Sequence, residues 1–274
     1  AECDGYRNRE NYHRGRCNWR RPGDCIARGF WAGVAGSCYD SLNAARGSIN
    51  GVRDAASGAI NSDGSTQASL TFNATGANST LVFNEAIGNT SGIGSLNARA
   101  ANITLNGAQV KTTGSQTFAG AITLAKNTLL QSTAANTTIA LSGAVNSDSA
   151  ANRSLNISTI GAGSTVSLGG AIGATNQLSQ VDITAGAIAL NGGAVNTSGN
   201  QTYAGAITLG STVKSDGTNR SLSLLDSGTT TLTGAIGGTG TTGDKLSSLS
   251  TDAGGNTLVN GGSIRTTGTQ TFGD

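Results

Sequence analysis

The sequence is poor in the residues that build helices, membrane spans and collagen. Of its 274 residues, 12% are charged and 4% are aromatic, and it has one proline and no methionine. Its 42 glycines do not recur at every third position, and together with the lack of proline this excludes a collagen triple helix. No apolar run approaches the ~20 residues that a membrane-spanning helix needs. We therefore expect no membrane span.

Helical spacing is also missing after residue 60. No window there places apolar residues three and four apart over ten or more positions, and Glu and Lys are scarce. Short runs instead alternate apolar and small polar residues, as in AITL at 121–124 and TVSL at 165–168, which is the period of a strand. Gly, Asn, Ser and Asp separate these runs and supply corners. This region is predicted to be all β.

An internal repeat organises this region into copies at 58–142, 143–211 and 212–274. TTGSQTFAGAITL from Thr112 matches TSGNQTYAGAITL from Thr197, and the third copy of the motif, TTGTQTF, begins at Thr266. The second interval is the shorter one, because LAKNTLLQSTAANTTIALSGAV in the earlier copy is reduced to LGSTV. Stacked coils tolerate such a loss, because each coil contacts only its neighbours. The deletion indicates about one lost coil, and either five coils of about 17 residues or four of about 21 would fill one copy.

A β-solenoid accounts for both the short strands and the constant register. Each coil would place Ile, Leu or Val over the same positions of the coil below, and each buried side chain would contribute roughly 1.5 to 3 kcal/mol. With adjacent strands about 4.8 Å apart, residues 58–274 would form a rod on the order of 50 to 60 Å long.

Residues 1–57 have a different composition and predict a separate small module. Nine of the seventeen basic residues lie there, all arginine, and the net charge is +3 against −1 for the remainder. All four cysteines are there too, without a C-x-x-C pair, so two disulfides are expected rather than a zinc site, although zinc held by His13 and some cysteines is an alternative. The cysteines are Cys3, Cys17, Cys25 and Cys38, and three pairings are open.

The end of this module has the apolar spacing of one helix face. From Asp40 or Ser41, which could cap the helix, that face would carry Leu42, Ala45, Ile49, Val52 and Ala56. The module would then cover the open end of the solenoid. Its arginines and aromatic residues could alternatively bind nucleic acid or an acidic glycan, but six interspersed acids favour the cap, and no nucleic-acid partner is expected.

The first residues, AEC, are typical of a protein whose leader has been removed at a small-residue site. Disulfides form in oxidising compartments. The two observations together predict an extracellular or cell-surface protein.

The repeat units resemble those of a known family. TTGSQTFAGAITL, TSGNQTYAGAITL and TTGTQTF, with the LNGG and GGAIG pieces between them, are similar to repeats of bacterial surface proteins of the filamentous-haemagglutinin and adhesin type. The resemblance covers residues 58–274 and implies a right-handed parallel β-helix. It also implies a place on a bacterial surface, as in a biofilm or an adhesive stalk.

No catalytic, cofactor or metal site is predicted, and the protein is not expected to be an enzyme. Asp63, Asp148 and Asp216 recur at equivalent corners, where Asp caps turns, and Arg153 and Arg220 are expected to be solvated surface. Paired carboxylates, a nucleophile elbow and a phosphate loop are all missing. Threonine runs raise the hypothesis of an ice-binding face. However, these runs do not recur at a constant coil spacing, and threonine favours strands in any case.

The repeat stops at TTGTQTFGD, where the earlier copies continue into a further strand. An uncovered coil offers backbone groups and apolar side chains to a matching edge. We expect head-to-tail association of the chain with itself into a fibre or stalk. A fragment of a surface adhesin that binds a glycan or host surface is the alternative. The candidate subunit junction comprises Trp19, Phe30, Trp31, Ile49, Val52, Thr269, Thr271 and Phe272.

Overall fold

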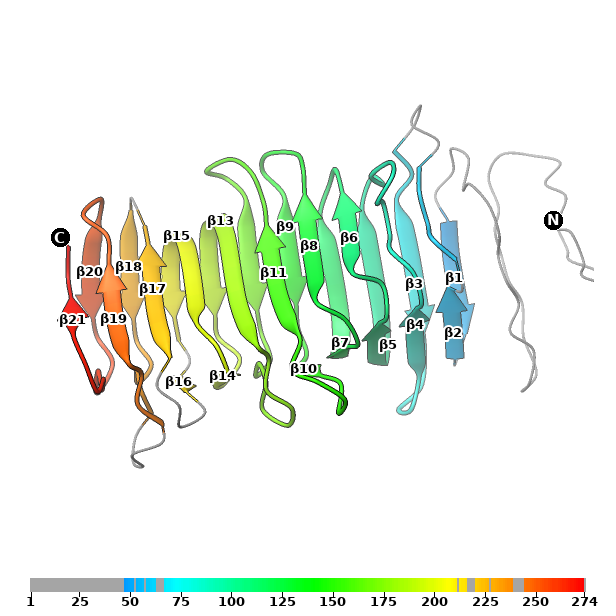
Figure 1. Cartoon of the computed structure of the whole chain (residues 1–274). Helices are drawn as coiled ribbons and strands as arrows, with labels where there is room; N and C mark the ends of the chain where they lie inside the picture. Colours follow the sequence, from blue (N-terminus) through cyan, green and yellow to red (C-terminus); the bar gives the residue numbers. More distant parts are fainter. Residues whose placement is uncertain are drawn as a thin grey trace, which may run out of the picture.

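The computed structural model describes most of the chain from Gly47 onward. The described residues are 47–51, 53–56, 58–62, 67–210, 212–215, 220–226, 228–238 and 244–273. Their strands pair in parallel and stack into one elongated column, which runs in Figure 1 from blue to red along the sequence. The expected all-β, parallel β-solenoid is confirmed. None of the described residues forms a helix that is long and apolar enough to span a membrane.

Three columns of strands, named here faces 1 to 3, form the sides of the solenoid. Face 1 stacks β1 (Gly47–Gly51), β3 (Leu70–Ala74), the first halves of β5 (Leu96–Leu105) and β7 (Gln116–Leu124), β9 (Thr138–Leu141), β12 (Thr165–Leu168), the second halves of β13 (Gln180–Leu190) and β15 (Gln201–Leu209), β18 (Thr229–Leu232) and β20 (Asn256–Val259).

Face 2 stacks β2 (Arg53–Ala56), β4 (Thr80–Phe83), the second halves of β5 and β7, β10 (Val145–Ser147), Ile172, β14 (Val195–Thr197), β16 (Val213–Ser215), Ile236 and Ile264. Face 3 stacks Ile60, Ile87, β6 (Gln109–Thr112), β8 (Thr128–Ser132), β11 (Ser154–Ser158), the first halves of β13 and β15, β17 (Ser221–Leu225), β19 (Ser248–Thr251) and β21 (Gln270–Thr271).

The turns are longer than either length expected from the sequence. Face 1 starts at Gly47 and reaches Thr257 nine turns later, so one turn takes about 23 residues. With about 4.8 Å between stacked strands, nine turns extend about 43 Å. The rod is shorter than expected because each turn spends more residues on its corners and outward loops.

A single apolar core fills the space between the faces. Leu96, Ala98, Ile103 and Leu105 alternate along β5 with outward residues, and each is at most 2% exposed. Near the first turns, the rings of Phe72 and Phe83 meet edge to face with centroids 5.0 Å apart. Strand alternation thus lays one inward row per face, and the rows of successive turns coincide because the pairing is in register.

The sequence copies do not occupy equivalent faces. Gln116 lies on face 1, but its counterpart Gln201 lies on face 3, because three turns and two thirds separate the two positions. Gln201 and Gln270 both lie on face 3, three whole turns apart. The segment missing from the later interval therefore corresponds to two strand segments, two thirds of a turn, and the expectation of one lost coil is wrong.

Two of the long strands, β7 and β15, turn a corner at a β-bulge that requires glycine. Opposite Gly120 lie two residues of β5, and opposite Gly205 lie two residues of β13, where the register shifts. Both glycines have positive φ, +153° and +138°. A Cβ on either would collide with the carbonyl oxygen of the turn below. The AGAITL motif is therefore a folded corner, at the boundary of faces 1 and 2 in one copy and of faces 3 and 1 in the next.

The solenoid begins before residue 58. Residues Gly47–Gly51 and Arg53–Ala56 form β1 and β2, which pair with β3 and β4, so the helix expected over 40–56 is wrong from Gly47 onward. Backbone pairing with the next turn outweighs a helical spacing that already contained Gly47 and Gly51. The four cysteines and His13 lie outside the described residues, so the disulfides stay a prediction.

Candidate functional site

The recurring T-x-G-x-Q-T motif folds into the same hydrogen-bonded corner three times. The hydroxyls of Thr112, Thr197 and Thr266 donate to the carbonyl two residues on, at 2.5, 2.7 and 2.8 Å. The glutamine amide four residues after each threonine donates to that hydroxyl at 3.2, 3.1 and 3.2 Å. The sequence motif is therefore a structural unit in which a side-chain amide is held by its own corner.

In the first two copies the same amide also ties one turn to the next. Gln116 Nε2 donates to the carbonyl oxygen of Gln131 at 2.8 Å, and Gln201 Nε2 donates to that of Lys214 at 3.4 Å. Both glutamines are at most 1% exposed. Gln270 is exposed, and within the described part of the chain its side chain bonds only to its own corner. Sequence repetition indicated this glutamine position. Only the structure shows that its amide bonds one turn to the next.

The aromatic residue of the motif shows the same contrast. Phe118 and Tyr203 are fully buried, whereas Phe272 is 44% exposed. On face 1, Val259 is 47% exposed although its register partner Leu232 in the turn below is fully buried. The last described turn therefore exposes core positions along its upper edge. This is the edge that faces the C-terminal end of the rod, which is red in Figure 1.

Three of the predicted junction residues meet at this edge. Thr269, Thr271 and Phe272 are exposed in the last turn, next to Gln270. Ile49 lies in β1 at the opposite end, paired with Phe72 through the backbone. The other four, Trp19, Phe30, Trp31 and Val52, lie outside the described residues. Val259 and Gln270 were missed, although their alignment with buried residues of earlier copies was a signal that could have found them.

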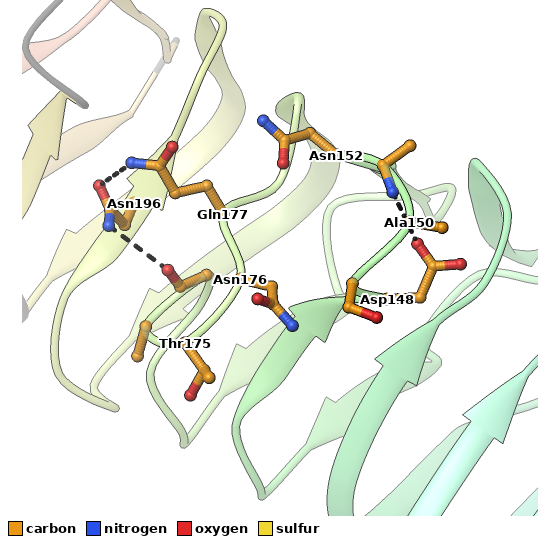
Figure 2. Close-up of a pocket in the computed structure, with 11 residues that line it drawn as sticks. Asp148, Ala150, Asn152, Thr175, Asn176, Gln177 and Asn196 are labelled. Carbon is orange, nitrogen blue, oxygen red and sulfur yellow. Dashed lines mark hydrogen bonds between the residues drawn. The ribbon is translucent and has the colours of Figure 1, made fainter.

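A polar hollow lies on the side of the rod, away from that edge. It has a volume of about 470 Å³ and is formed by the loops 148–152 and 173–177 together with Asn196 of the next turn. Figure 2 shows carboxamide side chains of both loops around it. Asp148 was expected only as a turn cap, and the other residues of the hollow were not predicted from the sequence, because a Gly-, Asn- and Ser-rich loop has the same composition as an ordinary solenoid corner.

One of the recurring aspartates lies at the rim of this hollow. Asp148 caps its loop by accepting from the Ala151 amide at 3.2 Å, as expected. Arg153 is not simply solvated: its Nε and Nη2 donate to the two carboxylate oxygens at 3.0 and 2.9 Å. These bonds hold the pKa of Asp148 below its ordinary value and raise that of Arg153. Asp63 and Asp216 lie outside the described residues.

In each copy, one side chain of the aspartate-containing corner holds the loop of the following turn. Asn61 Oδ1 accepts from the Thr90 amide at 3.0 Å, and Asn146 Oδ1 accepts from the Thr175 amide at 2.9 Å. In the third copy Lys214 stands at this position, and its Nζ lies 3.6 Å from Asp244 Oδ1. The fold therefore needs a polar contact here, but not one particular residue pair.

Among the described residues, no three His, Cys, Asp or Glu side chains lie close enough together to hold a metal ion. No family model, curated protein or solved structure matches the chain.

Proposed function

We propose that the chain is a secreted structural β-solenoid, right-handed, that builds an extracellular fibre or stalk by stacking end to end. The observation that carries the proposal is that all three faces keep their register from the first described layer to the last, so that one layer stacks on another throughout the rod. In the last described turn, Phe272 and Val259 are nearly half exposed, although the residues at the same positions in earlier turns are buried. A further parallel turn on its upper edge would bury both and give Gln270 a carbonyl acceptor.

We infer that a second copy of the chain supplies such a turn from its N-terminal region. Its first layer (β1, β2 and Ile60) has the same three-sided outline as the last layer (β20, Ile264 and β21), because all three faces continue in register between them. A contact of last layer on first layer is heterologous and does not close, so it generates a filament. The family resemblance of the repeats and the four cysteines before the first solenoid strand support an extracellular location.

Sedimentation velocity over a concentration series, with negative-stain electron microscopy, tests the association. We expect unbranched filaments as wide as one solenoid. Val259→Lys would place a charge in the contact and prevent assembly. Leu258→Lys adds the same charge one residue earlier on the outward side of β20 and serves as the matched control. A chain that stays monomeric at all concentrations would refute end-to-end stacking.

The predicted location has its own test. Intact-mass measurement of the exported chain before and after reduction should show a gain of four hydrogens, since two disulfides are expected among the four cysteines. Four free thiols in freshly isolated protein would contradict both the disulfides and the oxidising compartment.

A further inference from the structure

The polar hollow on the side of the rod is shaped by side-chain amides from three successive turns. Asn152 belongs to the loop 148–152, and Asn176 and Gln177 belong to the loop 173–177 of the next turn. Asn196 belongs to β14, one turn further along the rod. In Figure 2 the carboxamide of Asn152 lies above the gap between the loops, that of Asn176 lies within it, and that of Gln177 is directed toward Asn196. The hollow is therefore a concave, hydrogen-bonding surface.

The amide nitrogens are occupied within the protein, and this orients the amides. Asn176 Nδ2 donates to the Ser147 carbonyl at 3.2 Å, and Gln177 Nε2 donates to Asn196 Oδ1 at 3.3 Å. Asn152 Nδ2 donates to Ser198 Oγ at 2.9 Å. The side-chain carbonyl oxygens of Asn152, Asn176 and Gln177 accept no hydrogen bond from the described residues. Three fixed acceptors thus line the hollow without a donor from this part of the chain.

The first copy of the repeat shows that the fold does not require the amides of Asn176, Gln177 and Asn196, whereas Asn152 has another amide, Gln67, as its counterpart. Its loop is built in the same way, since Asn61 takes the place of Asn146 and Gly88 (φ +69°) that of Gly173 (φ +68°). Yet Ser91, Gly92 and Lys111 stand there at the positions of Asn176, Gln177 and Asn196. Because the loop folds without these three amides in one copy, their side-chain oxygens are available for another role in the other.

The charge around the hollow selects the kind of ligand. Among the described residues, Asp148 is the one ionisable group that lines it, and Arg153 binds both of its carboxylate oxygens. A cation would have to displace the guanidinium, and an anion would meet carbonyl oxygens. A neutral molecule rich in hydroxyl donors satisfies the three acceptors without either cost. We propose that the hollow is a binding site for a neutral saccharide, and this does not depend on whether the chain forms filaments.

The test is a glycan array that carries neutral, sialylated and sulfated oligosaccharides, probed with the full chain. The decisive variant combines Asn176→Ser, Gln177→Gly and Asn196→Lys, which installs the residues of the first copy. Gln177→Ala, a milder change, is the second variant. Ser91→Ala, at the counterpart of Asn176, is the matched control. Circular dichroism melting of each variant verifies the fold.

We expect the chain to bind neutral oligosaccharides, the triple variant to lose binding by about tenfold or more, and Ser91→Ala to bind unchanged. If the triple variant is misfolded, a loss in the folded Gln177→Ala variant carries the same conclusion. The proposal is overturned if no neutral glycan binds, if binding is confined to sialylated or sulfated glycans, or if the folded variants bind as the unmodified chain does.

Discussion

The corners at 112–124 and 197–209 have nearly the same sequence but differ in whether the buried side-chain oxygen of their glutamine has a hydrogen-bond donor. In the second corner the Tyr203 hydroxyl donates to Gln201 Oε1 at 2.9 Å. In the first, Phe118 has no hydroxyl, and Gln116 Oε1 is buried without a partner among the described residues. The comparison teaches that the motif depends on the amide nitrogen, which is bonded in both copies, and that the solenoid tolerates one unsatisfied buried oxygen at this corner.

The two corners share a glycine at the β-bulge, and substituting this glycine tests the common feature. Gly120→Ala and Gly205→Ala should each destabilise the fold by about 3 kcal/mol, because the backbone has positive φ and the new methyl would collide with the carbonyl oxygen of the turn below. Urea unfolding followed by circular dichroism measures the loss. Gly262→Ala, where nothing lies within 4 Å, is the control and should be nearly neutral. Tolerance of alanine at both corners would refute the bulge.

The two corners differ in the hydroxyl of their aromatic residue, and exchanging Phe118 and Tyr203 tests this difference. Tyr203→Phe leaves Gln201 Oε1 without its donor and should cost about 1 to 2 kcal/mol, whereas Phe118→Tyr supplies a donor to Gln116 Oε1 and should gain about 1 kcal/mol. The same unfolding experiment measures both. The double variant should be close to neutral, and a Phe118→Tyr variant that is destabilised would show that face 1 has no room for the hydroxyl.

Alkaline pH should distinguish the corners as well. Burial, with a smaller contribution from Asp182, raises the pKa of Tyr203 well above its ordinary value. The folded state therefore retains this proton more tightly than the unfolded chain does. The associated stability is fully present below the ordinary tyrosine pKa of about 10 and is lost as the pH rises above it. In melting curves between neutral pH and pH 11, Tyr203→Phe should lose less stability than the unmodified chain.

The smallest effect is expected at the edge of the hollow. Because Arg153 lowers the pKa of Asp148, the pair adds stability above the ordinary aspartate pKa, and this is lost as the pH falls through the lowered value. Asp148→Asn should therefore flatten the acid side of the stability profile slightly, since the pair is partly exposed to solvent. An unchanged acid profile would show that Arg153 contributes nothing at this site.

Some of these features were predictable from local sequence alone. Alternation in AITL and TVSL identified strands, and the constant register of the first two copies identified stacking. The helix predicted over 40–56 failed from Gly47 onward, because apolar spacing does not show that β3 and β4 offer backbone pairing partners to this segment. Thr269, Thr271 and Phe272 were predicted as junction residues, and that role stays a prediction, whereas the residues of the hollow around Asn176 have the composition of ordinary corners.

The sequence by itself determined the all-β class, the parallel stacking and which residues point inward, because strand alternation and repetition are local properties of the chain. Only the tertiary structure decided the length of a turn, the face on which each copy lies and the meeting of Asn152, Asn176 and Asn196 in one hollow. These depend on how many residues each corner takes up, and that is settled by hydrogen bonds and contacts between turns that lie about 20 to 30 positions apart in the chain.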